Sequence, residues 1–181
     1  MLALSGIGKV NAALSTALVL QHRPDFVINT GSAGGLGSGL KVGDVVIGTQ
    51  TAHHDVDVTA FGYAIGHVPQ MPARFESDPA LCAAAEKAAA AFEHAAVHRG
   101  LIVSGDQFVH SSESVAEVRR HFPDAQAVEM EAAAIAQSCH RFGVPFVVVR
   151  AISDLADEEA DTSFETFLKT ASVHSAKMVL Q

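Results

Sequence analysis

The chain has 181 residues, 49% of them hydrophobic, with 12 Lys or Arg against 20 Asp or Glu and a formal net charge of −8. The length and apolar content predict a single folded domain over residues 1–181 and argue against a disordered chain. The acidic balance argues against a non-specific nucleic-acid or anionic-membrane surface, and no apolar run reaches the ~20 residues that span a bilayer.

Hydrophobic periodicity and turn residues divide the chain into strands that alternate with helices. In chain order we predict a helix at 9–23, strands at 26–30 and 44–52, a long loop at 53–75, a helix at 79–95, a strand at 99–105, a helix at 111–122, a short strand running into a helix within 125–143, a strand at 144–153 and a helix at 163–181. Loops as long as 53–75 inside a compact domain serve as lids or interface arms.

Strands that alternate with helices, two of them continuous apolar runs, indicate an α/β fold whose sheet is covered on both faces. In such folds ligands bind at the carboxyl ends of strands. Four predicted strand ends carry glycines or polar side chains, in the segments "NTGSAGG", "SGDQF", "VEME" and "RAISD". We expect these four ends to converge on one cleft.

The glycine-rich segment "GSAGG" at 31–35 follows a predicted strand. It is not a Walker A loop, because no GK[ST] follows, and it does not open a helix as a GxGxxG turn does. Two interpretations stay open for it. One is a tight turn that needs glycine at positive φ, and the other is a set of small residues that lets backbone N–H groups approach a ligand.

Three carboxylates stand at predicted strand ends, and each has a structural and a functional interpretation. Glu129 and Glu131 lie at a strand-to-helix junction, where the helix dipole favours them. A Glu at a strand end beside Met130 also suits the binding of vicinal sugar hydroxyls. Asp154 follows the last strand, where local sequence favours a helix cap, and the acidic residues after it suit a solvated turn.

The run "HHDVD" at 53–57 invites a metal-site interpretation. Adjacent histidines point in different directions on most backbones, however, and no spaced partner such as HExxH occurs. Cys82 and Cys139 lack a CxxC partner and a nucleophile context, and no GxSxG motif is present. We therefore expect no metal, no covalent hydrolase chemistry, and two buried thiols of a cytoplasmic protein.

Seven segments taken together resemble the 5′-methylthioadenosine/S-adenosylhomocysteine nucleosidases of the nucleoside phosphorylase/hydrolase superfamily: "SGIGKVNAA", "NTGSAGGL", "HDVDVTAFGY", "LIVSGDQF", "AVEMEAAAIA", "FVVVRAISD" and "SFETFL". They follow the family's order and spacing. The resemblance implies a three-layer α/β/α fold with a central mixed, twisted sheet. It also implies hydrolysis of the N-glycosidic bond of an adenine nucleoside, by a cytoplasmic homodimer that needs no cofactor.

The resemblance further implies roles for the residues at the strand ends. Asp154 would be the catalytic acid that protonates adenine N7, with Ser153 orienting it, because an anionic purine is a poor leaving group. Burial would have to raise the pKa of Asp154 for it to act near pH 7. Glu131 would hold the ribose 2′- and 3′-hydroxyls, and Met130 would pack against the sugar. Glu129 belongs to the same implied substrate-binding set.

Other residues are implied to surround the base and the sugar. Phe108 would stack on adenine, and the main chain of Val109 would read its Watson–Crick edge. Arg150 would support Glu131 and the site of the attacking water. The rest of the implied set is Ile7, Ser32, Ala33, Gly34 and Phe164, of which Phe164 would cover the base or the alkylthio tail.

In this family the partner subunit completes the pocket for the 5′-alkylthio group. The resemblance therefore assigns a role to the long loop, from which Val58, Phe61 and Pro69 would reach across to the other subunit. An apolar pocket there suits methylthio or homocysteinyl groups and rejects a bare hydroxyl only weakly.

The chain departs from the family pattern at one point. Family members carry an upstream Gly-Ala-Met-Glu-Glu-like stretch whose glutamate activates the attacking water, and no segment of these 181 residues matches it. The segment "MLALSG" therefore corresponds to the end of the family's third strand. We expect this chain to turn over far more slowly than a version extended upstream.

Three other functions stay open. One is a futalosine-type or AMP-type nucleosidase, although AMP would need a cationic 5′ site and none is evident in the sequence. A phosphorylase of the same superfamily would use phosphate in place of water, but it needs arginines to hold that phosphate, and "NTGSAGG" has none. A non-catalytic nucleoside-binding protein would keep Asp154 and Glu131 without the upstream base.

Overall fold

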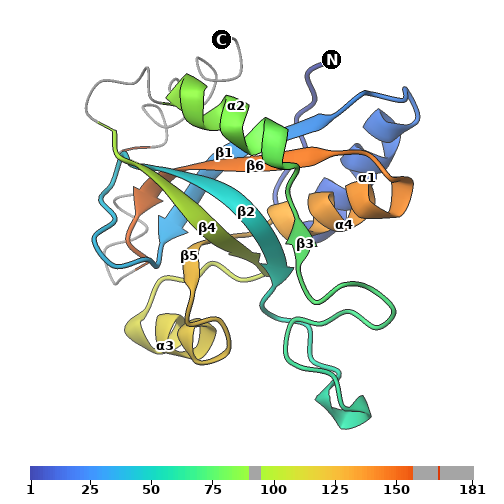
Figure 1. Cartoon of the computed structure of the whole chain (residues 1–181). Coiled ribbons are helices and arrows are strands. Elements are labelled where there is room, and N and C mark those ends of the chain that lie inside the picture. The colour runs from blue at the N-terminus through green and yellow to red at the C-terminus, as the bar shows by residue number, and fades with distance from the viewer. Residues whose placement is uncertain (90–94, 157–166, 168–181) are drawn as a thin grey trace.

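The computed structural model describes residues 1–89, 95–156 and 167, and within them a six-stranded mixed sheet lies among four α-helices (Figure 1). The strands are β1 (Val27–Gly35), β2 (Val45–His53), β3 (Phe75–Glu76), β4 (Val97–Ser104), β5 (Ala125–Glu129) and β6 (Phe146–Asp154). The helices are α1 (Lys9–Leu20), α2 (Pro79–Ala89), α3 (Ser112–His121) and α4 (Ala132–Phe142), with a short 3-10 helix η1 (Thr59–Phe61). The predicted α/β class is confirmed, and the predicted helix at 163–181 lies outside the described residues except for Phe167.

The strand order is β3-β2-β4-β5-β1-β6, and β2 also pairs with β6. Strand β1 is parallel to β6, and β4 is parallel to both β2 and β5. The pairs β1–β5 and β2–β6 are antiparallel. The sheet is therefore mixed, as predicted, and the β2–β6 pairing closes it on itself.

Helices cover both faces of the strands at the centre of the fold. On β6, Val148 packs into the cluster with α1 and α4, whereas its neighbours Val147 and Val149 pack against α2. Residues of β2 alternate in the same way, since successive side chains of a strand point to opposite faces. Both faces are buried, which explains why these strands are continuous apolar runs.

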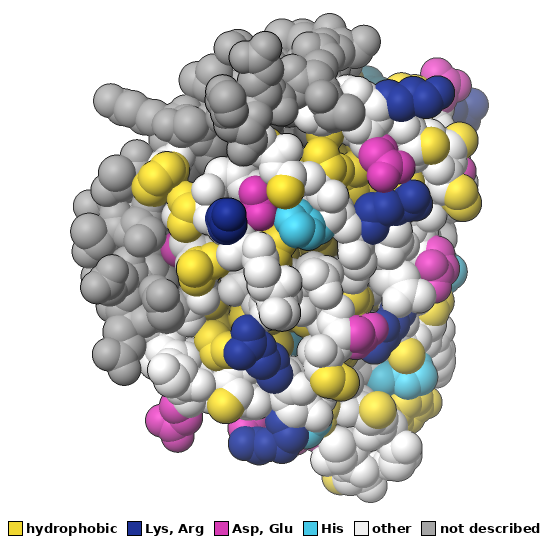
Figure 2. Space-filling model, turned by 60° about the vertical axis from the view of Figure 1, so that its left-hand side comes forward, with side chains coloured by type: hydrophobic (Ala, Val, Ile, Leu, Met, Phe, Trp, Pro, Cys, Tyr) yellow, Lys and Arg dark blue, Asp and Glu magenta, His cyan; other side chains and the backbone are white. Residues whose placement is uncertain are grey.

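The helix ends follow local signals in the sequence. Ser111 caps α3 by accepting the backbone N–H of Ser114, whose hydroxyl in turn accepts the N–H of Ser111. Gly143 ends α4 at a φ of 68°, a conformation that favours glycine. In the part of the chain that the structure describes, no helix is long and apolar enough to cross a membrane. The face drawn in Figure 2 carries basic and acidic side chains interspersed rather than a field of one sign.

The segment "GSAGG" belongs to β1 and forms no turn, so the tight-turn interpretation is wrong. None of Gly31, Gly34 and Gly35 has a positive φ. A Cβ on Gly31 would lie 2.0 Å from Nη1 of Arg150, and one on Gly34 would lie 2.9 Å from Oδ1 of Asp154. The glycines therefore make room for the side chains of Arg150 and Asp154 on β6, a close approach that the sequence pattern could not distinguish from approach by a ligand.

Candidate active site

Strand pairing places the carboxyl ends of four strands in a row. Gly34 of β1 pairs with Val128 of β5 and also with Asp154 of β6. Ser104, the last residue of β4, pairs with Glu129, the last residue of β5. The four strand ends expected to converge are thus neighbours in the sheet.

Asp154 is the buried carboxyl at the end of β6, with 2% of its surface exposed. Its Oδ2 accepts a hydrogen bond from Ser153 Oγ at 2.8 Å, and its Oδ1 accepts the backbone N–H of Ala156 at 2.9 Å. The second contact closes a local turn, so the capping tendency of aspartate is used here for a turn after a strand. Both oxygens are held, which fixes the direction in which the carboxyl points.

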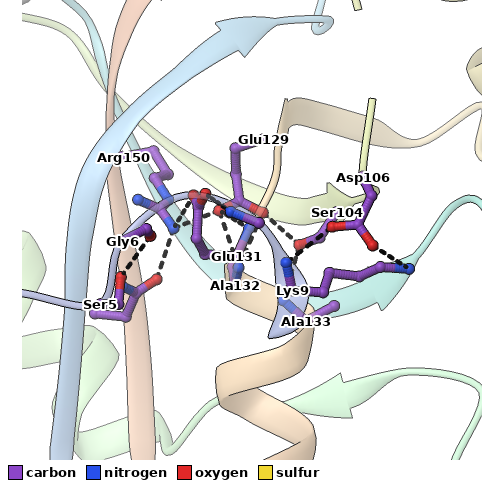
Figure 3. Close-up of polar contacts among 12 residues, drawn as sticks. Ser5, Gly6, Lys9, Ser104, Asp106, Glu129, Glu131, Ala132, Ala133 and Arg150 are labelled. Atoms are coloured by element: carbon purple, nitrogen blue, oxygen red, sulfur yellow. Dashed lines mark hydrogen bonds and ion pairs between the residues drawn. The ribbon is translucent and has the colours of Figure 1, made fainter. Parts of the chain in front are cut away.

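Glu129 is a buried hub at the junction of β5 and α4 (Figure 3). Its carboxylate accepts hydrogen bonds from the hydroxyl of Ser104 and from Nη2 of Arg150. It also accepts the backbone N–H of Glu131 at 3.0 Å and that of Ala132 at 2.9 Å. Glu129 therefore caps α4 and orients Arg150, roles that the sequence alone did not predict.

Glu131 is the N-cap residue of α4, but its side chain makes no capping hydrogen bond. Its Oε1 instead accepts the backbone N–H of Gly8 at 2.9 Å, and its Oε2 lies 4.0 Å from Nη2 of Arg150. Burial and the nearby negative charge of Glu129 raise the pKa of Glu131, and the Gly8 N–H works in the opposite direction. Glu131 is half-buried, whereas both oxygens of the neighbouring Glu129 already accept hydrogen bonds from the protein.

Arg150 is 3% exposed and points from β6 toward β1 and β5. Its Nη2 donates to Asn29 Oδ1 at 2.7 Å and to Glu129, while its Nε has no partner among the described residues. Because the guanidinium is paired with a buried carboxylate, its charge is already neutralised. Arg150 lies against the "GSAGG" segment, yet it is engaged by protein rather than free for a phosphate.

The residues predicted to hold the base lie after β4. Phe108 is 45% exposed, and its ring stacks on His110 with 6.0 Å between centroids and 14° between planes. Val109 is 5% exposed and packs its side chain into the core beneath α3. A buried side chain at Val109 holds the main chain beside Phe108 in place.

The other predicted residues differ in how close they lie to the strand ends. Ser32 and Ala33 are on β1, and Met130 is half-buried between the two glutamates. Ile7 precedes α1 and is 76% exposed. Of the loop residues predicted for the partner's pocket, Val58 is the N-cap residue of η1 and Phe61, 81% exposed, is its last residue, and η1 projects from the body in Figure 1. Pro69 lies further along the same loop. Phe164 lies outside the described residues.

The residues of "HHDVD" take separate partners. His53 Nε2 is 2.9 Å from Gln137 Oε1, and Asp55 Oδ1 is 2.6 Å from Lys9 Nζ. Asp57 accepts hydrogen bonds from Thr59. In residues 1–89, 95–156 and 167, no group of three or more His, Cys, Asp or Glu side chains is placed to hold a metal ion.

The buried histidines predict an acid-labile fold. Burial lowers the pKa of both His53 and His54 below the ordinary 6.5. As the pH falls below 6.5, the unfolded chain binds protons at these positions and the folded chain resists them, so the free energy of unfolding decreases. We expect the Tm to fall between pH 6.5 and the lowered pKa values. His54→Gln should flatten that dependence, while the exposed His22→Gln should not, as thermal unfolding at several pH values will test.

The close approach of Gly34 to Asp154 gives a second prediction. The Cβ added by Gly34→Ala would lie close to Asp154 Oδ1 and also 3.1 Å from Cβ of Ala156. The new methyl group is therefore confined on both sides, and the Asp154 carboxyl would have to shift. We expect kcat to fall by about 10- to 100-fold through misplacement of the carboxyl. Ser38→Ala, a change at an exposed residue three positions after the "GSAGG" segment, serves as the control. The test is the steady-state kcat of Gly34→Ala and of Ser38→Ala. Equal values for the two variants would contradict the idea that a side chain at position 34 displaces the Asp154 carboxyl.

Comparison with known proteins identifies the family of the chain. The family model described as "Phosphorylase superfamily" matches residues 1–181. A 5′-methylthioadenosine/S-adenosylhomocysteine nucleosidase of Anoxybacillus flavithermus is 59% identical over 176 residues, which are 97% of this chain and 76% of that protein. The fold and the strand-end site thus define a member of the phosphorylase superfamily.

Solved structures narrow the assignment. The nucleosidase of the same description from Neisseria meningitidis, in complex with methylthio-immucillin-A, has a TM-score of 0.95 and 71% identity, covering 98% of this chain and 77% of that one. The Colwellia psychrerythraea nucleosidase, in complex with adenine, has a TM-score of 0.94 and 49% identity, covering 97% and 74%. The chain belongs to the 5′-methylthioadenosine/S-adenosylhomocysteine nucleosidases.

Proposed function

We propose that the chain hydrolyses the N-glycosidic bond of 5′-methylthioadenosine and S-adenosylhomocysteine, releasing adenine and the thioribose, with Asp154 as the proton donor. One observation carries the proposal: Asp154 is buried at a strand end, with Ser153 and the N–H of Ala156 fixing both of its oxygens. The bond from C1′ to N9 breaks with its electron pair moving into the purine. A proton delivered to N7 prevents an anionic leaving group from forming.

The sugar is proposed to bind at Glu131. Its carboxylate accepts the 2′- and 3′-hydroxyls, and Met130 packs against the ring. The negative charge nearby also stabilises the oxocarbenium-like sugar that forms as the base departs. Glu129 and Arg150 support this position, since one fixes the backbone of Glu131 and the other lies 4.0 Å from its Oε2.

The base is proposed to stack on Phe108, with the main chain of Val109 at its Watson–Crick edge. The support is that Phe108 presents an exposed ring beside the end of β4, while the Val109 side chain is anchored in the core. Ile7, Ser32, Ala33 and Gly34 complete the sugar side of the site, and Phe164 is proposed to cover the base or the tail.

Water rather than phosphate is proposed as the nucleophile. Its oxygen forms the new bond to C1′, and the proton that it gives up passes to bulk solvent, since none of these 181 residues is assigned as its base. Arg150 approaches the "GSAGG" strand, but Glu129 and Asn29 hold it. Incubation of the chain with 5′-methylthioadenosine, with and without phosphate, tests this by chromatography of released adenine. Release that is independent of phosphate is expected. Dependence on phosphate would identify a phosphorylase, and binding without release would identify a non-catalytic nucleoside-binding protein.

We also propose a cytoplasmic homodimer in which Val58, Phe61 and Pro69 complete the partner's alkylthio pocket. The high exposure of the Phe61 ring, on a loop that projects from the body, supports this arrangement. Sedimentation of the chain at several concentrations tests it, since a monomer at all concentrations would contradict the proposal.

A further inference from the structure

We infer that Lys9, Asp55 and Asp106 form a latch that fixes the N-terminus of α1 against Glu131, which makes Lys9 and Asp55 positioning residues for the sugar hydroxyls. The inference rests on the proposed function, because it assigns a task to the Glu131 carboxylate. None of the three residues belongs to the predicted site. Figure 3 shows Lys9 extended toward Asp106 on one side of the cluster, with Glu131 and Arg150 on the other.

The latch joins three distant parts of the chain. Lys9 Nζ lies 2.6 Å from Asp55 Oδ1 and 3.8 Å from Asp106 Oδ2. The backbone N–H of Lys9 donates to Asp106 Oδ1 at 2.9 Å, and that of Asp106 donates to Asp55 Oδ2 at 2.9 Å. Asp55 and Asp106 each stand two residues beyond the end of a strand, β2 and β4. The start of α1 is therefore tied to the same sheet edge that carries the site.

The connection to Glu131 runs through one peptide unit. Gly8, the N-cap residue of α1, has no side chain to cap the helix, and its N–H donates to Glu131 Oε1 at 2.9 Å. The next residue is Lys9, which the latch holds by both its backbone and its side chain. Gly8 has a φ of 89°, and a Cβ there would lie 3.3 Å from Asp106 Oδ1. The direction of the Gly8 N–H is therefore set by the latch and not by Glu131 alone.

The ion pair between Lys9 and Asp55 at the centre of the latch is largely shielded from solvent. The side chains of Lys9 and Asp55 are each 18% exposed. Burial by itself would raise the pKa of Asp55, but the hydrogen bonds from Lys9 and from the Asp106 N–H lower it. Asp55 thus stays ionised and paired at neutral pH. Exposed ion pairs contribute little, whereas a partly buried pair with two added hydrogen bonds restricts the backbone more strongly.

The helix end also has an electrostatic effect on Glu131. The N-terminus of a helix carries partial positive charge, and here its first N–H groups meet the carboxylates of Glu131 and Asp106. A carboxylate that accepts this N–H keeps a fixed rotamer and presents its remaining lone pairs to sugar hydroxyls. Loosening the latch should therefore weaken hydroxyl recognition, with little effect on the parts of the nucleoside that bind elsewhere.

A substrate-deletion experiment tests the inference by isothermal titration calorimetry. The titrations use an Asp154→Asn background, in which cleavage of the nucleoside is slowed. This unchanged parent chain and its Lys9→Met, Lys9→Arg, Asp55→Asn and surface-control Lys87→Met variants are each titrated with 5′-methylthioadenosine and with its 2′,3′-dideoxy analogue. We expect Lys9→Met and Asp55→Asn to bind the natural nucleoside about tenfold more weakly, the size of one lost charge-assisted hydrogen bond. Their affinity for the dideoxy analogue should be unchanged. Lys9→Arg should recover part of the loss, and Lys87→Met should match the unchanged chain.

The outcomes separate this inference from the proposed function. If the unchanged chain does not prefer the natural nucleoside over the analogue, the sugar role of Glu131 fails and the latch loses its task. If that preference exists and both latch variants keep it, the latch is structural only and the inference is overturned. An equal loss of affinity for both ligands overturns it as well. Because Asp55→Asn is isosteric, it provides the test even if Lys9→Met does not fold.

Discussion

Asp154→Asn should lower kcat for cleavage of 5′-methylthioadenosine by about 10²- to 10⁴-fold, the range that a positioned general acid contributes. Asparagine keeps the shape of the side chain, with an oxygen that accepts the N–H of Ala156 and an amide group that donates to Ser153 Oγ, but it cannot supply the proton that the departing purine needs. The Kd of the substrate should therefore change far less than kcat. Single-turnover rates of adenine release, together with calorimetric binding, measure the two quantities separately.

The matched control is Asp25→Asn, an exposed aspartate in the turn before β1. It should leave both kcat and Kd unchanged. If Asp154→Asn stays within a few-fold of the unchanged chain, the general-acid assignment is wrong. If it loses binding and keeps the rate at saturation, Asp154 serves as a ligand for the base and not as an acid.

Arg150→Met should destabilise the fold by about 3–5 kcal/mol, because it leaves the carboxylate of Glu129 buried without its cationic partner. Both side chains are only 3% exposed, so water cannot take the place of the guanidinium. Asn29 would also lose the donor to its side-chain oxygen. Urea unfolding followed by circular dichroism gives the free energy of unfolding for comparison.

The double variant Arg150→Met with Glu129→Gln makes that prediction specific. Glutamine removes the buried negative charge and keeps one oxygen for the N–H groups at the start of α4. The double variant should therefore have a larger free energy of unfolding than Arg150→Met alone. Both variants lose the contact of Arg150 with Glu131, so that loss does not affect the comparison. A double variant less stable than the single one would show that the charge of Glu129 is tolerated without Arg150.

Patterning in the sequence was sufficient for the class of fold and for the region of the site. Apolar runs such as Val147–Val149 could be recognised because a strand buried on both faces needs such residues at every position. Gly143 and Ser111 gave the ends of two helices, because αL geometry and side-chain capping each select few residue types. Parallel pairing accounts for the meeting of the ends of β4 with β5 and of β1 with β6, but these two pairs lie together because β1 and β5, although antiparallel, pair only near their carboxyl ends, which patterning does not predict.

The contacts that organise the site could not be read in the same way. Glu129 and Glu131 are two residues apart with the same chemistry, yet one is saturated by protein donors and the other is half-buried. Which is which depends on Ser104 and Arg150, which are distant in sequence. The glycines of β1 were ambiguous because both a turn and a close approach need a missing Cβ. Lys9 gave no signal, since a single lysine at a helix start is usually solvated.

The closure of the sheet determines how the site can move. Strand β6 is hydrogen-bonded to β1 along one edge and to β2 along the other, and all nine of its residues are buried. Its amide protons should exchange with solvent only when the whole domain unfolds, whereas loops open locally at lower cost. Asp154, the proposed proton donor, therefore lies on a strand that is not expected to open locally. In the proposed dimer, the accommodation of different 5′-substituents falls to the long loop, so that substrate range can change without displacing Asp154.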